Sequence, residues 1–300
     1  MGHEHIQPAK DYNRAFAIGI LLNLTFVGIE FFYGQRAHSL ALVADAGHNL
    51  GDVLGLALAW GAAVLSRRNP TANRTYGLRR SSILAALINA IVLLIALGAI
   101  AWEAVNRFMT PAPVAEQTVI WVAAAGILVN AVTAILFFSD REHDLNIRGA
   151  FLHMAADAAV SAGVAACGFL IMTTGWFWLD PLVSLVICAI IVAGTWGLLR
   201  DSLNLALDAV PEGIAVSAVL EYLKALPKVT EVHDLHIWGM STTEAALTAH
   251  LVMKEPVCDD AFLMEVEVEL HKRFGIEHTT LQLESGDREI PCRCHLSSKA

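Results

Sequence analysis

The chain has 300 residues and a net charge of −9, and it is 56% hydrophobic but only 16% charged. Soluble domains carry about 25% charged residues, so this composition indicates a membrane protein rather than a soluble one. The acidity argues against nucleic acid as a partner and suits cations. Residues 212–300 hold 15 of the 29 acidic residues and only 8 of the 20 basic ones, which predicts an acidic soluble part after a membrane part.

Six apolar segments follow a polar N-terminal tail at residues 1–14. Each is long enough to cross about 30 Å of hydrocarbon as a helix. We therefore expect an all-α membrane domain of six transmembrane helices within residues 15–210. The segments cover residues 15–33, 40–65, 83–105, 114–138, 149–173 and 176–199.

Arginine is distributed unevenly among the loops that join these segments. The loop after the second segment carries five arginines and the loop after the fourth carries two, whereas the loops on the other side carry only Arg36 and Arg107. Cytoplasmic loops are enriched in basic residues. Both termini are therefore predicted to be cytoplasmic, in the inner membrane if the chain is bacterial.

Residues 211–288 have the pattern of a small α+β domain. Helical spacing of apolar residues is followed by two strands, a helix that begins at the acidic pair Asp259 and Asp260 and ends near Phe274, and a third strand. The order α-β-β-α-β predicts a ferredoxin-like cytosolic domain. A domain of ~85 residues is marginally stable alone, so metal binding or dimerisation is expected to stabilise it.

Two of the predicted membrane helices contain an ionisable pair with the same spacing: His48 and Asp52 in AGHNLGDVLG, and His153 and Asp157 in FLHMAADAAV. Residues four apart share a helix face. Ionisable groups inside a membrane are costly unless they are paired or bind an ion. Two imidazoles and two carboxylates form a ligand set that suits Zn²⁺ and balances its charge, and the same groups can take up protons instead. We predict one shared site that exchanges a divalent cation for protons.

Other interpretations of these pairs stay open. One His-x-x-x-Asp pair alone is explained equally well by an intrahelical hydrogen bond, but its repetition in a second helix favours a metal site. Efflux of Co²⁺, Cd²⁺ or Ni²⁺ is an alternative, because two histidines also suit these ions. A membrane zinc sensor without flux is a second alternative. Neither motif has the His-Glu-x-x-His form of zinc proteases, so we predict a secondary active transporter and not an enzyme.

Several neighbouring residues have expected roles. Asp45, one turn before His48, is an accessory membrane acid: an acid on the path to the site, a partner of a ligating histidine, or a proton acceptor. Small residues such as Gly51 and Gly55 predict a close approach between the two helices that carry the pairs. Three further acids lie near segment ends, where an interfacial position is expected: Glu30, Glu103 and Asp180.

The motifs ADAGHNLGD and FLHMAAD, together with VHDLHIWGMS and LTAHL in the acidic part, resemble those of the cation diffusion facilitators. Within that family the chain is similar to bacterial zinc exporters related to animal zinc transporters, from about residue 12 to 285. The resemblance implies a homodimer in the lipid bilayer that exports Zn²⁺ in exchange for protons. It also implies that the transport site consists of His48, Asp52, His153 and Asp157.

The resemblance further implies a metal site in the cytosolic domain, with Zn²⁺ as its expected ion. His233 and His250 match ligand positions of the family, and Gln282 and Glu284 fall where a histidine and an acid lie in some relatives. Cys258 is a further candidate ligand.

A structural role for the tail histidines is the alternative. Strict strand alternation places His233 on the same side as Leu235 and Ile237, and His236 on the same side as Asp234.

The tail at residues 289–300 contains a short cluster of Cys292, Cys294 and His295, which favours soft or borderline metals. A disordered tail is the alternative.

Two features concern the loop after the second segment. Some relatives carry metal-binding histidines there, but this chain has Arg74 and Leu78 at those places, so no metal site is expected. The family also has a charge interlock between this region and the end of the sixth span. The resemblance assigns it to Arg79 or Arg80 with Asp208.

Overall fold

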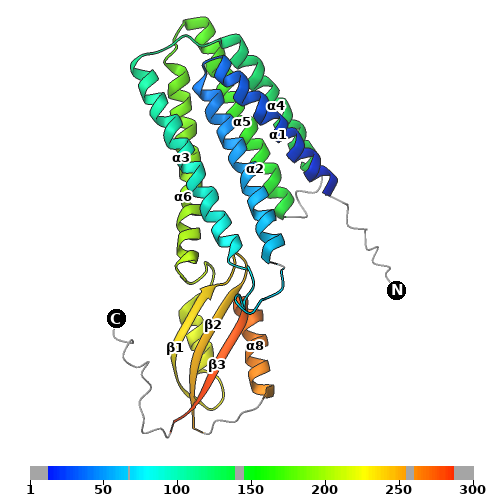
Figure 1. Cartoon of the computed structure of the whole chain (residues 1–300), viewed down its shortest axis with the longest axis vertical. Helices are drawn as coiled ribbons and strands as arrows, with labels where there is room; N and C mark the ends of the chain where they lie inside the picture. Colours follow the sequence, from blue (N-terminus) through cyan, green and yellow to red (C-terminus); the bar gives the residue numbers. More distant parts are fainter. Residues whose placement is uncertain (1–12, 67, 139–144, 255–259, 287–300) are drawn as a thin grey trace, which may run out of the picture. The chain divides into compact units, whose positions relative to one another are not determined.

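The computed structural model describes residues 13–66, 68–138, 145–254 and 260–286 (Figure 1). Six long helices come first, and each coincides with one of the six expected apolar segments. The prediction of a helical membrane part is therefore confirmed. The helices are α1 (Asn13–Arg36), α2 (Leu40–Ser66), α3 (Ser81–Met109), α4 (Glu116–Phe138), α5 (Leu145–Thr174) and α6 (Leu179–Ala206).

Four of these helices, α3 to α6, have described stretches that are long and apolar enough to cross a membrane. Large apolar side chains on α3 and α4 stay more than half exposed, as lipid-facing surfaces require: Ile95, Trp102, Trp121, Leu128 and Ile135. The chain is thus an integral membrane protein, and the crossing of α1 and α2 stays a prediction.

The chain folds into two compact units. The first contains the residues up to Ala57 and Asn89–Gly197, and the second contains Leu58–Ile88 and the residues from Leu198 onward. The helices α2, α3 and α6 contribute residues to both units. The domain limits expected from the sequence, after residues 14, 210 and 288, stay predictions.

The core of the first unit is apolar and rich in small residues. Its buried members include Phe26, Leu42 and Val164. Helix α4 packs along α5 and α1, and Gly126 of α4 makes this possible. A Cβ atom at Gly126 would lie 2.8 Å from the Phe26 ring and 3.0 Å from the Ser161 hydroxyl. Small residues at such crossings let membrane helices approach closely.

The glycines of α2 serve a different contact from the expected one. An added Cβ atom would lie 2.8 Å from Leu93 at Gly51 and 3.0 Å from the amide of Asn89 at Gly55, and both neighbours belong to α3. The expectation that these glycines bring α2 close to α5 is therefore wrong. Gly51 lies three residues after His48, about 60° around the helix from it on the side away from Asp52.

Asp180 at the start of α6 is buried. Its carboxylate accepts hydrogen bonds from the Ser39 hydroxyl and from the backbone amide of Leu40, the latter at 2.7 Å. The first amides of a helix have no partner within the helix. Asp180, which belongs to α6, supplies the missing acceptor to the first amide of α2. The tertiary cap explains why Asp180 is buried within the protein at the start of α6, and its expected interfacial depth stays a prediction.

The second unit contains the predicted α-β-β-α-β order, which confirms the fold class of the cytosolic part. Its elements are α7 (Val216–Lys224), β1 (Val229–Gly239), β2 (Ala245–Met253), α8 (Asp260–Phe274) and β3 (Ile276–Ser285). The sheet has the order β1-β2-β3, in which β1 is antiparallel and β3 parallel to β2. Buried residues of both helices and all three strands form one core, including Leu223, Leu251 and Leu270.

A β-bulge in β1 decides which residues the open face of this sheet presents. Asp234 has a left-handed backbone (φ 50°), and the register shifts between His233 and His236. The β2 partners of these two histidines are two positions apart, so both histidines lie on one face, whereas Leu235 and Ile237 pack with the core. The expectation that His233 shares a side with Leu235 and Ile237 is wrong, because strict alternation ignores the extra residue of a bulge.

Replacing Asp180 with alanine should destabilise the first unit. The change leaves the Ser39 hydroxyl and the Leu40 amide without their acceptor, and each buried donor without a partner costs about 1–3 kcal/mol. We expect a lower apparent unfolding temperature of the purified protein in detergent. The matched control is Glu103→Gln, which alters an exposed acid paired with Arg107. Equal unfolding temperatures for the two variants would contradict the capping role.

Candidate metal sites

The two ionisable pairs of the membrane part meet side by side. His48 and Asp52 lie one turn apart on α2, and His153 and Asp157 lie one turn apart on α5. Each histidine contacts the acid of the other helix. His48 Nε2 lies 3.4 Å from Asp157 Oδ1, and His153 Nε2 lies 3.2 Å from Asp52 Oδ2.

Contacts within each helix close these four side chains into a ring, which we call the membrane ring. His48 Nδ1 lies 3.7 Å from Asp52 Oδ2, and His153 Nε2 lies 3.7 Å from Asp157 Oδ2. Ligands of a tetrahedral zinc ion, each about 2.0–2.1 Å from the metal, are separated by about 3.4 Å. With one ligand atom from each residue, His48, Asp52 and Asp157 lie within 4.8 Å of one another, and His153 adjoins them through its contacts with Asp52 and Asp157.

Several ligand atoms of the membrane ring are buried without a hydrogen-bond partner. Asp157 is 1% exposed, while Asp52 and His48 are partly buried. Asp52 Oδ2, Asp157 Oδ2 and His48 Nδ1 are buried and have no hydrogen-bond partner in the described part of the chain. Such atoms are costly in a medium of low dielectric constant. A bound cation or bound protons would satisfy them.

Two further acids lie deep in the first unit. Asp45 Oδ2 accepts a hydrogen bond from the Ser161 hydroxyl at 3.0 Å. Glu30 is fully buried and accepts a hydrogen bond from Asn49 Nδ2 at 3.3 Å, so its expected interfacial position is wrong. The signal in the sequence was the absence of any basic residue three or four positions away on α1. Without such a partner, a carboxylate in an apolar helix points inward.

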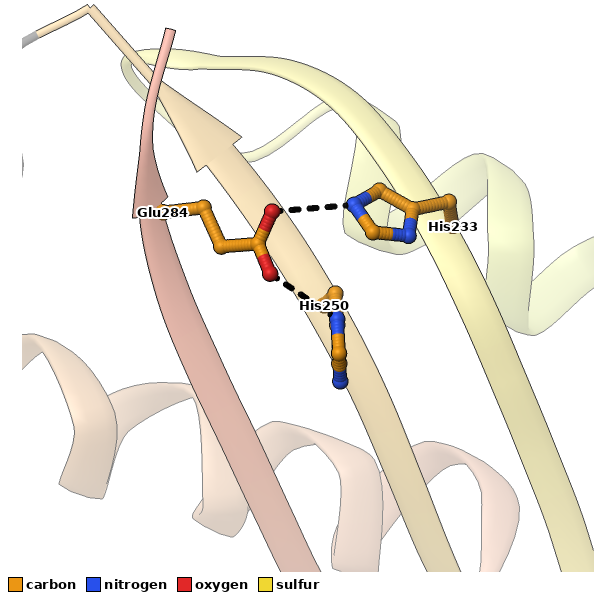
Figure 2. A group of neighbouring side chains, drawn as sticks. All are labelled: His233, His250 and Glu284. Atoms are coloured by element: carbon orange, nitrogen blue, oxygen red, sulfur yellow. Dashed lines mark hydrogen bonds and ion pairs between the residues drawn. The ribbon is translucent and has the colours of Figure 1, made fainter. Parts of the chain in front are cut away.

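A second group of ligand-type side chains, His233, His250 and Glu284, lies on the open face of the sheet in the second unit, and we call it the sheet cluster (Figure 2). His233 Nε2 lies 3.2 Å from Glu284 Oε2, and His250 Nδ1 lies 3.0 Å from Glu284 Oε1. Three ligand atoms of these residues lie within 4.8 Å of one another. Gln282 donates a hydrogen bond to Glu284 Oε1 at 2.8 Å, so it orients the carboxylate.

Electrostatics keep the acids of this cluster ionised. Burial raises the pKa of Glu284, but hydrogen bonds from His233 and Gln282 outweigh it, and the pKa lies below its usual value. The hydrogen bond from His236, at 3.0 Å, likewise lowers the pKa of Asp234. Asp234 Oδ2 also lies 3.6 Å from the Nε2 atom of His250, which extends the cluster beyond the residues expected from the sequence.

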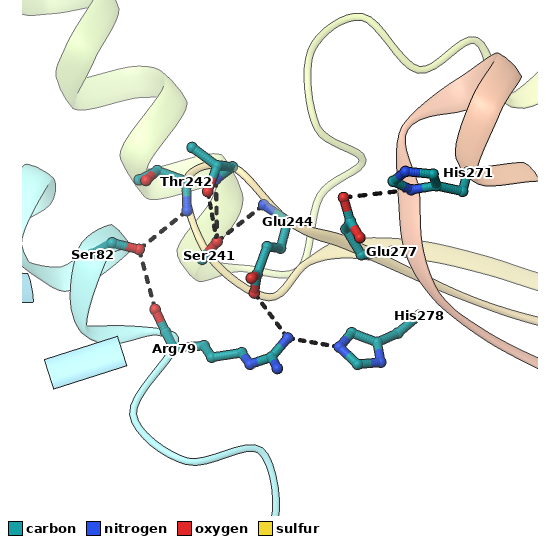
Figure 3. Close-up of polar contacts among 9 residues, drawn as sticks. Arg79, Ser82, Ser241, Thr242, Glu244, His271, Glu277 and His278 are labelled. Atoms are coloured by element: carbon teal, nitrogen blue, oxygen red, sulfur yellow. Dashed lines mark hydrogen bonds and ion pairs between the residues drawn. The ribbon is translucent and has the colours of Figure 1, made fainter. Parts of the chain in front are cut away.

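The two arginines considered for the charge interlock have different partners. Arg80 pairs with Asp208. Arg79 Nη1 instead contacts Glu244 at 2.9 Å and His278 at 2.6 Å (Figure 3). A contact between Arg79 and Asp208 is not formed, because Glu244 and His278 satisfy the guanidinium.

The remaining expected ligands cannot be placed. They lie outside the described residues: Cys258, Cys292, Cys294 and His295. Within the described part of the chain, the membrane ring and the sheet cluster hold the groups of three or more potential ligands close enough to share an ion.

Comparisons with known proteins agree with this two-part organisation. Residues 16–205 match the family model of the cation efflux transmembrane domain, and residues 211–286 match that of the cation efflux protein cytoplasmic domain. The chain is 33% identical to the cadmium, cobalt and zinc/H(+)-K(+) antiporter of Bacillus subtilis, with 95% of this chain and 92% of that protein covered. It is 35% identical to the zinc transporter ZitB of Shigella flexneri, with 99% and 96% covered.

One solved structure is also similar: the metal-bound C-terminal domain of the CzcD transporter from Cuprividus metallidurans. It is 35% identical, covers 24% of this chain and 99% of that domain, and has a TM-score of 0.22.

Substitutions at His278 should test whether it accepts a hydrogen bond from Arg79. Glutamine keeps an acceptor, whereas lysine removes it and adds a second cation beside the guanidinium. We expect faster amide hydrogen exchange at residues 74–80 in His278→Lys and near-unchanged exchange in His278→Gln, measured by mass spectrometry on the full chain. Equal exchange in both variants would show that the contact does not hold this loop.

Proposed function

The chain belongs to the cation efflux family, and from this premise we propose that it exports Zn²⁺ from the cytosol through His48, Asp52, His153 and Asp157. The family consists of cation transporters, so the chain is a transporter and not an enzyme. The observation that carries the proposal is the closed contact circuit of the membrane ring.

The ligand chemistry of the membrane ring favours a borderline divalent cation. Two carboxylates supply −2, which neutralises the ion and lowers the cost of holding it among apolar helices. Two imidazoles select zinc-like ions over Mg²⁺ and Mn²⁺, which suit oxygen ligands. Cd²⁺ and Co²⁺ remain alternative cargoes, since the name of the Bacillus subtilis relative includes them, and Ni²⁺ is allowed by the same chemistry.

The same ring supports exchange for protons. Without a cation, its two acids carry −2 in a medium of low dielectric constant, so protonation of the imidazoles and carboxylates relieves the charge. Metal ligands must release their protons before they bind. Cation and protons therefore compete for the same atoms, which is the requirement for antiport.

The chain is a homodimer through its cytosolic domain. The same domain carries the second metal site that we propose. We assign a divalent ion, with Zn²⁺ preferred, to His233, His250 and Glu284, because two histidines and a carboxylate offer three ligand atoms on one face. Both termini face the cytoplasm in this proposal, since the arginine-rich loops lie on that side. The domain then samples the same pool of metal that the membrane ring exports.

Neutralising an acid of the membrane ring should stop transport. Asp52→Asn and Asp157→Asn remove a negative ligand but keep the side-chain shape, so we expect at least a ~10-fold loss of Zn²⁺ flux in reconstituted vesicles, equivalent to about 1.4 kcal/mol or more. Flux is measured with a zinc indicator under an imposed pH gradient. Glu103→Gln is the control and should transport at the unmodified rate.

Two outcomes of this experiment would contradict the proposal. Full flux in either aspartate variant would remove the ring from the transport path. Zinc binding by the unmodified chain without any flux would instead favour a membrane sensor.

The sheet cluster should bind metal independently of the membrane ring. His250→Ala removes one of the three ligands of the sheet cluster, so we expect about one Zn²⁺ fewer per chain. The bound metal is counted by elemental mass spectrometry after dialysis. The count should fall further in the combination with Asp157→Asn. His271→Ala, at an exposed histidine paired with Glu277 on the same domain, is the control and should leave the count unchanged. An unchanged count in His250→Ala would refute the assignment.

A further inference from the structure

Glu30 and Asp45 form a buried carboxyl pair that the membrane ring does not use. Glu30 lies on α1 and Asp45 on α2, and both side chains are 0% exposed. Neither forms an ion pair with a basic side chain in the described part of the chain. Two carboxyl groups in such a place need another source of positive charge.

The hydrogen bonds of the pair account for only one oxygen of each acid. Asn49 donates to Glu30 Oε2 at 3.3 Å, and Ser161 donates to Asp45 Oδ2 at 3.0 Å. Glu30 Oε1 and Asp45 Oδ1 are buried, and no described amide, hydroxyl or amino group donates to them. Asn49 lies one turn after Asp45 on α2, so its hydrogen bond to Glu30 places the carboxyl groups of Glu30 and Asp45 side by side.

Two adjacent buried carboxyl groups, each with one oxygen that no other group donates to, can satisfy each other only through a hydrogen bond between them. An ionised carboxylate is only an acceptor, so one of the two acids must carry a proton and donate it to the other. Two ionised acids side by side in a medium of low dielectric constant would repel each other strongly. We propose that Glu30 and Asp45 are a proton-binding site, separate from the membrane ring, which holds one proton between the two carboxyl groups and releases it when the ring takes up a cation.

The coupling follows from the neighbours of the pair. Asn49, the donor to Glu30, follows His48 in α2, and Ser161, the donor to Asp45, lies one turn after Asp157 in α5. The titratable groups facing the pair are His48 and Asp157. The only charged residue of α4 is Glu116 in its first turn, and α1 has no charge other than Glu30 between Arg14 and Arg36. The charge state of the ring is therefore the main electrostatic influence on the pair.

Uptake of one divalent cation with release of the one proton of the pair changes the total charge of the ring and the pair from −3 to −2. A ring that holds a divalent cation is close to neutral, and loss of the shared proton then leaves the pair at −2. A ring that has lost the cation and has not yet taken up protons carries −2, and the pair then keeps its proton and carries only −1. The inference rests on the proposed function of the ring, but it adds a proton that no ring atom carries.

The test uses the full chain with Glu30→Gln and Asp45→Asn, and with Glu103→Gln as the control. Proton release on addition of Zn²⁺ in weak buffer should fall by about one proton per chain in each pair variant. Zinc affinity, measured by calorimetry, should stay within a few-fold of the unmodified chain. Infrared difference spectra on zinc binding should lose the carbonyl band of a protonated carboxyl group in both variants and keep it in the control.

Each other result overturns the inference. Unmodified proton release in Glu30→Gln would show that the pair does not exchange its proton. A ~100-fold loss of zinc affinity would make Glu30 part of metal binding. Absence of the carboxyl band from the unmodified chain would refute the shared proton even if a variant failed to fold. Failure of the proposed function is distinguishable, since the unmodified chain would then show no zinc flux in vesicles.

Discussion

The cost of a carboxylate among apolar helices governs the membrane part of this structure. Five buried or partly buried acids meet that cost in different ways: Glu30, Asp45, Asp52, Asp157 and Asp180. Asp180 receives a hydroxyl and backbone amides at the start of α2. Asp52 and Asp157 face two histidines across a helix interface. Each solution uses a partner from another helix, so the requirement to pair these acids also fixes how α2 packs with α5 and α6.

Much of the candidate site could be predicted from the sequence because its geometry is local. A spacing of four residues places His48 with Asp52 and His153 with Asp157 on any regular helix, and the repetition suggested that the pairs meet. The inward position of Glu30 depends on Asn49 of another helix. No pattern within α1 reveals that partner. The same reason applies to Asp180, whose cap is completed only after α6 meets α2.

The cytosolic domain shows a second kind of limit. Its order of helices and strands followed from apolar periodicity, but one inserted residue, Asp234, reversed the predicted side of His233. A bulge of this kind leaves almost no trace in a hydrophobic pattern because it changes the register of a strand and not its composition. The error mattered, since the bulge brings His233 beside His250 and turns two isolated histidines into a cluster with Glu284.

The two clusters share ligand types but differ in charge, and that difference suits different tasks. The membrane ring has two acids and two histidines, so it can be neutral with a divalent cation and can be relieved by protons without one. The sheet cluster has one buried acid at its centre, Glu284, which hydrogen bonds from His233 and Gln282 hold ionised. A site that must empty on every cycle needs a replacement for its cargo, and protons provide it. The sheet cluster needs no such replacement, because His233, His250 and Gln282 already contact the single carboxylate of Glu284 without an ion.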